Sequence, residues 1–148
     1  MADSIEKSID IRAPIERVWT ALTDHEQFGT WFRAKMAGPF KVGEATKGRV
    51  TSPGYEHILW DATVTAMGRP HRFAFTWHPY AIDTAVDYSL EPPTLVEFTL
   101  EPTGEGTRLT VTESGFDALP AHRRDIALRM NEGGWTQQVL NIKAHVEA

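Results

Sequence analysis

The sequence predicts an α+β domain in which a meander of antiparallel strands packs around one long C-terminal helix. Three observations indicate this class. An alternating strand pattern over residues 4–12 leads directly into a helix at Pro14, strand patterns alone follow up to Ser114, and a long helical pattern then covers residues 119–146. A sheet that encloses a helix in this way tends to leave a cavity, and we expect function to reside there.

Length and composition indicate how many domains the chain forms and which kinds of partner it is expected to have. The 148 residues fit one domain, 1–148, and 41% hydrophobic with 24% charged residues is ordinary for a globular protein. A net charge of −5 with scattered basic residues argues against a nucleic-acid partner. No apolar run is long enough to span a membrane. Residues 1–6 lack the features of a signal peptide, so we expect a cytoplasmic protein.

The first strand and the helices after it follow from side-chain spacing. Ile5, Ile9 and Ile11 take odd positions of 4–12 and polar residues take the even ones, which is the period of a half-buried strand. Pro14 suits the first turn of a helix, and Phe28, Trp31 and Phe32 predict a second short helix that Gly29 weakens. The apolar stripe of the first helix follows the i, i+3, i+4, i+7 rule. It consists of Ile15, Val18, Trp19 and Leu22.

The residue pattern in the middle of the chain predicts strands and turns. Glycines and prolines punctuate short strands in 36–56. Segments 58–66, 72–77 and 94–101 each carry apolar residues on one face, and a Gly-rich turn at 103–106 leads to a last strand. Strands with one apolar face suit an antiparallel sheet that is covered on one side.

The helix predicted over 119–146 provides that cover. Its inner stripe consists of Leu128, Trp135, Val139, Ile142 and Val146. Arg123, Arg124 and Arg129 are expected to face water. Gly133-Gly134 in the middle of the pattern indicates a kink or a close approach of another backbone.

The connection from Pro79 to Pro93 has no clear periodicity and contains Asp83 and Asp87. A connection of this length inside a compact domain is typical of a functional lid or a mobile loop. We therefore expect it to open and close the entrance of the cavity.

A set of short motifs follows in order along almost the whole chain. They are Ile11-Arg12-Ala13-Pro14, Val18-Trp19-Thr20-Ala21-Leu22-Thr23, Trp31-Phe32, Arg72-Phe73, Phe75-Thr76-Trp77, Val96-Glu97-Phe98-Thr99-Leu100, Gly106-Thr107-Arg108-Leu109, Glu113-Ser114-Gly115-Phe116 and Gly134-Trp135. With these motifs the chain resembles the helix-grip superfamily of START-like, or SRPBCC, domains. Within it, the chain is most similar to the family related to the C-terminal domain of the activator of heat-shock-protein-ninety ATPase.

The resemblance implies a curved antiparallel sheet around a long C-terminal helix, with two short helices after the first strand. It also implies a cavity that, in different members, holds lipids, sterols, polyketides or other apolar molecules. The chain departs from the family at Glu113, because the residue before Ser-Gly-Phe is often a histidine in such sequences.

Glu113 is the most informative polar residue, because it continues the inward series Leu109, Val111, Glu113. Burial disfavours the charged form of a carboxyl group, as in many general acids and bases. Glu113 is therefore a candidate polar anchor for a ligand, or an acid/base residue if the protein is an enzyme. The alternative is that the strand ends there and Glu113 reaches solvent or pairs with an arginine.

Aromatic residues supply the rest of the candidate site, since binding pockets are mostly apolar with a few placed polar groups. Aromatic residues at strand and helix spacing are also the usual material of a core, so each has a plain structural alternative. The predicted ligand-binding residues are Trp31, His57, Trp60, Phe75, Trp77, Tyr80, Phe98, Glu113, Phe116, Asn131 and Trp135.

No motif indicates a catalytic nucleophile, a metal or a cofactor. The chain has no cysteine and no Gly-x-Ser-x-Gly elbow, and Ser114 suits a turn hydroxyl. The six histidines lack the spacing of a metal site. We therefore expect no cofactor and no metal.

Three hypotheses remain open at this level. The favoured one is binding of a small, largely apolar ligand in a cavity between sheet and C-terminal helix, as a carrier or sensor. A cyclase- or hydrolase-like enzyme that uses Glu113 is the second. A protein-interaction or stress-response module is the third, and it would need an exposed apolar patch. Homodimerisation through the polar sheet face or an edge strand is left open.

Overall fold

The computed structural model describes residues 4–83 and 85–148. Its elements are β1 (Ser4–Ile11), α1 (Ile15–Thr23), α2 (His25–Phe32), β2 (Ala34–Met36), β3 (Ala45–Val50), β4 (Leu59–Gly68), β5 (Arg72–Trp77), η1 (Tyr88–Leu90), β6 (Thr94–Thr103), β7 (Gly106–Ser114), η2 (Phe116–Ala118) and α3 (Ala121–Glu147).

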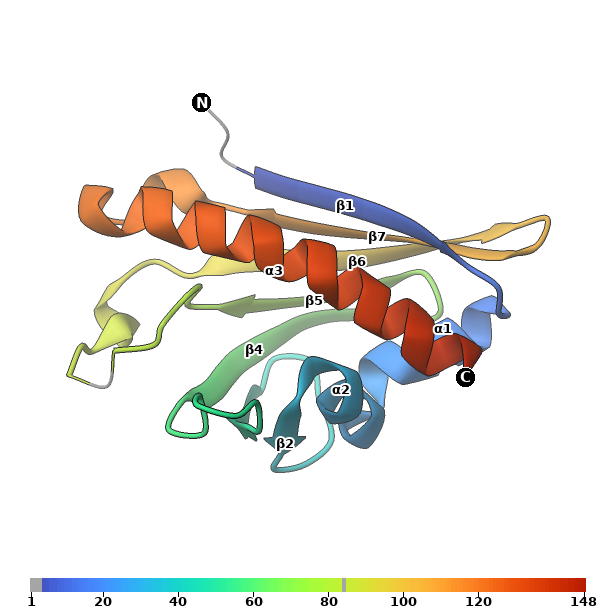
Figure 1. The fold of residues 1–148 in the computed structure, drawn as a ribbon, viewed down its shortest axis with the longest axis horizontal. Helices are drawn as coiled ribbons and strands as arrows, with labels where there is room; N and C mark the ends of the chain where they lie inside the picture. The colour runs from blue at the N-terminus through green and yellow to red at the C-terminus, as the bar shows by residue number, and fades with distance from the viewer. Residues whose placement is uncertain (1–3, 84) are drawn as a thin grey trace.

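The described strands form one seven-stranded sheet with the order β1-β7-β6-β5-β4-β3-β2. Every neighbouring pair is antiparallel. The sheet curves around α3, which crosses one face of it, and α1 and α2 lie by the C-terminal end of α3 (Figure 1). The predicted class, a curved antiparallel sheet that grips a long C-terminal helix after two short helices, is confirmed.

The N-terminal half follows the predicted pattern. Ile5 and Ile11 of β1 are buried, and α1 buries Val18, Trp19, Ala21 and Leu22. The Asp24 side chain accepts a hydrogen bond from the backbone N–H of Glu26, which caps α2.

Gly29 has a specific reason to lie inside α2. A Cβ atom at this position would stand 2.2 Å from the carbonyl oxygen of Ala34. The helix and the start of β2 therefore approach so closely that a side chain is excluded. The low helix propensity of glycine is offset by this packing.

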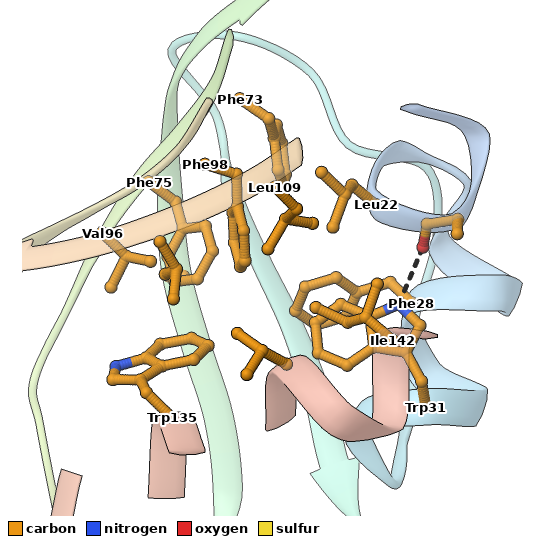
Figure 2. Close-up of a cluster of buried hydrophobic side chains, with 14 of the residues drawn as sticks. Leu22, Phe28, Trp31, Phe73, Phe75, Val96, Phe98, Leu109, Trp135 and Ile142 are labelled. Atoms are coloured by element: carbon orange, nitrogen blue, oxygen red, sulfur yellow. Dashed lines mark hydrogen bonds between the residues drawn. The ribbon is translucent and has the colours of Figure 1, made fainter. Parts of the chain in front are cut away.

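The space between the sheet and the helices is filled by large side chains. Phe28, Phe75 and Phe98 are fully buried, and Trp31 and Trp135 are 3% and 2% exposed. Figure 2 shows Trp135 of α3 facing Phe75 and Val96 of the sheet. The indole of Trp31 donates to the carbonyl of Ala21 at 2.8 Å, which satisfies its buried N–H. The centre of the domain is thus a packed core.

Two of the predictions for helix α3 are wrong. It runs without interruption through Gly133 and Gly134, where an added Cβ would meet nothing within 4 Å, so no other backbone approaches there. Arg123 was expected to face water but is only 7% exposed. The predicted stripe is otherwise confirmed. The buried residues are Arg123, Ala127, Trp135, Val139, Ile142 and Val146, and Leu128 packs at the edge of the core.

Candidate ligand pocket and the buried carboxylate beside it

The Glu113 side chain is fully buried near the end of β7 and accepts four hydrogen bonds. Trp77 Nε1 and Thr94 Oγ1 donate to Oε2 at 2.7 and 2.6 Å. Trp135 Nε1 and Asn131 Nδ2 donate to Oε1 at 2.8 and 2.9 Å. The carboxylate thus joins two strands, β5 and β6, to helix α3.

This arrangement suits an ionised carboxylate, which offers only acceptor sites. Each Glu113 oxygen receives two donors, and no ion pair among the described residues includes Glu113. Neutral donors therefore stabilise the charge in place of a basic residue. The sequence prediction that Glu113 points inward is confirmed, and the alternative of a solvent-exposed or arginine-paired side chain is wrong.

A pocket of about 580 Å³ lies beside this cluster, at the end of the sheet where β4 begins and β5 ends. Its volume falls in the range of about 300–1,000 Å³ typical of ligand sites. The walls are mainly aromatic and aliphatic. They include Phe32, Trp60, Trp77, Tyr80, Ile82 and Tyr88. The outer wall is formed by residues 80–83 and 86–89 of the connection between β5 and β6, which is yellow-green in Figure 1.

Trp60 carries an unusual feature. The residue lines the pocket and is 5% exposed, yet its indole Nε1 has no hydrogen-bond partner. A buried donor without a partner costs about 1–3 kcal/mol. The indoles of Trp77 and Trp135, in contrast, are both paired with Glu113.

Arg123 fastens the outer wall of the pocket to α3. Its guanidinium donates to the carbonyls of Pro79 and Tyr80 at 2.6 and 3.0 Å and forms an ion pair with Glu91 at 3.1 Å. It also lies 4.7 Å from the ring centroid of Tyr88. These contacts hold both ends of the segment 79–91, and they hold Tyr80 in a left-handed conformation with a φ of 51°.

A smaller pocket of about 150 Å³ lies between α2, β5 and α3. Phe32 and Trp77 line both pockets, and their ring centroids are 6.0 Å apart. These two rings therefore form the partition between the large pocket and the small one. Glu113 is not among the lining residues of either pocket, because its own donors cover it.

The predicted ligand-binding residues divide into three groups. His57, Trp60, Trp77 and Tyr80 line the large pocket. Asn131 and Trp135, with Trp77, line the small one. Trp31, Phe75, Phe98 and Phe116 lie in the packed core.

Sequence reasoning missed Phe32, Thr94, Tyr88 and Arg123 as parts of this region. Phe32 was assigned to the apolar stripe of α2, and Thr94 follows two prolines without a distinguishing pattern. A buried arginine at the start of a helix gives no periodic signal. The lid prediction for 79–93 was the one indication that Tyr88 belongs here.

The electrostatic character of the outer wall is acidic. Hydrogen bonds from the hydroxyl and the backbone N–H of Ser89 hold the pKa of Asp87 below its ordinary value, with His78 adding a smaller favourable charge. Asp87 is exposed and so carries its negative charge at neutral pH. Among the described residues, no three His, Asp or Glu side chains converge as a metal site would require.

Fold and pockets together define an α+β helix-grip domain. A family model described as "Activator of Hsp90 ATPase homolog 1-like protein" matches residues 12–147. The chain therefore belongs to this family. A search of curated proteins found no match. No described helix is long and apolar enough to cross a membrane.

Three solved structures share the fold at less than 25% identity. DynU16, a putative protein in the dynemicin biosynthetic locus, is 23% identical with a TM-score of 0.77 over 100% of this chain. The chain spans only 48% of DynU16. MLL2253 from Mesorhizobium loti is 24% identical, with a TM-score of 0.75 over 97% of this chain and 96% of that one. The Aha1 dimer from Colwellia psychrerythraea is 20% identical, with a TM-score of 0.73 over 99% and 97%.

Proposed function

We propose that the protein binds a small, largely apolar molecule in the large pocket and acts as a carrier or sensor without catalysis. The observation that carries the proposal is the pocket of about 580 Å³ with its mainly aromatic and aliphatic wall. The site lies at the end of the sheet, beside the packed space between sheet and α3 where the sequence suggested a cavity.

The binding energy in this proposal comes from burial of apolar surface. Each square ångström removed from water contributes about 25 cal/mol. Phe32, Trp77 and Tyr80 supply the apolar wall, and the segment fastened by Arg123 excludes water on the outer side. Glu113 acts indirectly, because it fixes the indole of Trp77 from behind.

The enzyme alternative draws less support from the contacts of Glu113. A general acid or base must reach the proton of its substrate within hydrogen-bond distance. Four donors already occupy the two Glu113 oxygens, and the carboxylate lines neither pocket. A structural role accounts for all of these contacts.

The protein-partner alternative draws on a few exposed apolar side chains. Leu59 and Leu90 are 64% and 84% exposed, and Val86 is 44% exposed. Leu59 and Val86 also line the pocket, so a ligand would cover part of this surface. The solved Aha1 dimer favours testing for self-association, and the DynU16 neighbour from a biosynthetic locus favours a small molecule. The absence of a nucleic-acid partner and the cytoplasmic location stay predictions.

Native mass spectrometry of the purified protein, followed by organic extraction, tests the proposal. We expect a co-purifying apolar molecule, or a thermal shift with members of a lipid and aromatic-compound panel. A Ser89→Trp variant, which fills the pocket from its outer wall, should lose both. Val42→Trp, at an exposed position that does not line the pocket, is the matched control and should retain them.

A clean apo mass with no thermal shift across the panel would contradict ligand binding. In that case a concentration-dependent mass or a captured partner protein would favour an interaction module. Equal binding by Ser89→Trp and the unmodified protein would place the ligand elsewhere.

A further inference from the structure

We propose that the small pocket beside α3 is a second binding site, and that it takes one flat aromatic ring carrying an uncharged hydrogen-bond donor, such as a phenol. The inference goes beyond the proposed function, because it concerns a separate pocket and does not depend on what the large pocket binds. Three features support it: the size of the small pocket, the fixed position of its walls and an amide oxygen without a partner.

The small pocket has the size of a site for a single ring. Its volume is about 150 Å³, and an apolar cavity of about this volume can hold benzene. The ring centroids of Phe32 and Trp77 are 6.0 Å apart, and those of Trp77 and Trp135 are 5.8 Å apart. Three aromatic side chains therefore form one continuous wall. Such a wall suits a flat ring, because offset-stacked and edge-to-face ring pairs are favourable.

Helix α3 forms the other side of the pocket with residues that share one helix face. Asn131, Gly134, Trp135 and Gln138 are spaced i, i+3, i+4 and i+7. Gly134 places no side chain in this row, and an added Cβ there would meet nothing within 4 Å. The space over Gly134 is therefore open, and a long side chain at this position would fill the pocket. Gly133 also has open space around it but does not line the pocket.

The buried Glu113 carboxylate fixes three of the lining residues. Trp77 Nε1, Trp135 Nε1 and Asn131 Nδ2 donate to it at 2.7, 2.8 and 2.9 Å. Of these three residues, only Trp77 also lines the large pocket. Glu113 is thus a positioning residue mainly for the small pocket. A wall that is already fixed lowers the cost of ordering side chains when a ligand binds.

Asn131 supplies the polar group that selects the ligand. A carboxylate only accepts hydrogen bonds, so the Asn131 amide must turn its nitrogen toward Glu113. Its Oδ1 remains as an acceptor and receives no hydrogen bond from the part of the chain that the structure describes. Asn131 is half-buried and lines the pocket, so an O–H or N–H group of a ligand can reach it. No charged residue lines the small pocket, which favours an uncharged donor.

Phenol and toluene test the inference, because they differ only in a hydroxyl against a methyl group. In an NMR titration we expect phenol to bind with a Kd of about 1 mM, an affinity that seven heavy atoms can supply. The shifts should appear at the amides of 131–138 and at the Trp135 indole. Asn131→Leu should weaken phenol binding about fivefold and leave toluene binding within about twofold. Retained toluene binding also shows that this variant has folded.

A pair of glycine variants tests the position of the site. Gly134→Leu should abolish binding of both probes, whereas the matched control Gly133→Leu should retain it. Both variants should keep the fold, because leucine favours a helix more than glycine does.

The inference is overturned if Gly134→Leu binds phenol as the unmodified protein does, or if Asn131→Leu weakens phenol and toluene equally. It is also overturned if neither probe shifts the amides of 131–138. Phenol shifts confined to 57–61 and 80–89 would exclude the small-pocket site and still support ligand binding in the large pocket.

Discussion

At the scale of single residues, Glu113 is the point where sheet and helix are joined by polar contacts. A buried charge is costly unless it is fully hydrogen-bonded. Here donors from β5, β6 and α3 meet on one carboxylate, so its removal would leave four donors without this partner, two of them on the buried residues Thr94 and Trp135.

Replacing Glu113 by Gln should destabilise the fold by about 2–4 kcal/mol. A glutamine amide offers one acceptor oxygen and turns an NH₂ group toward two other donors, so their hydrogen bonds are lost. Urea unfolding of the variant measures the loss. Glu105→Gln, at an exposed position, should stay within about 0.5 kcal/mol of the unmodified protein. Equal stability of the two variants would show that the carboxylate is not structurally important.

The inward direction of Glu113 could be predicted, because alternation along β7 fixes it by Leu109 and Val111. Its partners could not be predicted. Thr94 and Asn131 lie 19 and 18 residues away on different elements. Their meeting depends on how α3 crosses the sheet, which no local pattern encodes.

At the scale of elements, Arg123 holds both ends of the 79–91 segment against α3, beside the pocket. The ion pair is nearly buried, with side-chain exposures of 9% for Arg123 and 11% for Glu91. In the sequence, Arg123 stands with Arg124 and Arg129 and resembles a solvated helix face. Burial of one of the three follows from tertiary packing alone.

An Arg123→Met variant should lose about 3–5 kcal/mol of stability, because Glu91 and two carbonyls lose their partner. Hydrogen exchange should accelerate at the amides of 79–91 before other regions. Arg129→Met, on an exposed position of the same helix, is the control and should leave exchange unchanged. If the amides of 79–91 exchange equally slowly in Arg123→Met and in the unmodified protein, Arg123 does not hold this segment in place.

Substitution by alanine should change the stability of the fold in opposite directions at two helical glycines. Gly29→Ala places a Cβ against the Ala34 carbonyl and should destabilise by about 1–3 kcal/mol. Gly133→Ala meets open space on an exposed helix position and should stabilise by about 1 kcal/mol. Thermal unfolding of both variants makes the comparison. A stabilising Gly29→Ala would show that α2 and β2 are not closely packed in solution.

At the scale of the whole molecule, exposed polar contacts join β1 to β7 and the residue after β1 to α3. The hydrogen bond from Arg108 holds the pKa of Asp10 below its ordinary value of 3.8. The backbone N–H of Arg12 and then Lys143 hold the pKa of Glu147 below its ordinary value of 4.5. Since both pKa values are lower in the folded state, their contribution is present above the ordinary values and is lost as the pH falls below them.

The melting temperature should therefore decrease from about pH 5 to about pH 3, partly through these two groups. The variant Asp10→Asn/Glu147→Gln should show a shallower decrease over the same range than the unmodified protein. The same slope in both proteins would show that the pairs contribute nothing in solution.

Most of the architecture could be predicted from the sequence, because alternation in β1, β5, β6 and β7 and the stripe of α3 are strong local signals. The position of the pocket could not. The aromatic residues that were expected around a central cavity include Phe75 and Phe98, which fill the core instead. Only packing distinguishes a ring that lines a pocket from a ring that fills the interior.

The central claim is that the pocket where β4 begins and β5 ends binds a small apolar molecule. The most direct measurement is an NMR titration with 2-naphthylmethanol that follows backbone amides and the five tryptophan indoles. We expect shifts at residues 57–61 and 77–89 and at the Trp60 indole, and none in the turn at 103–106. A spectrum that stays unchanged, or shifts that gather away from these residues, would contradict the account.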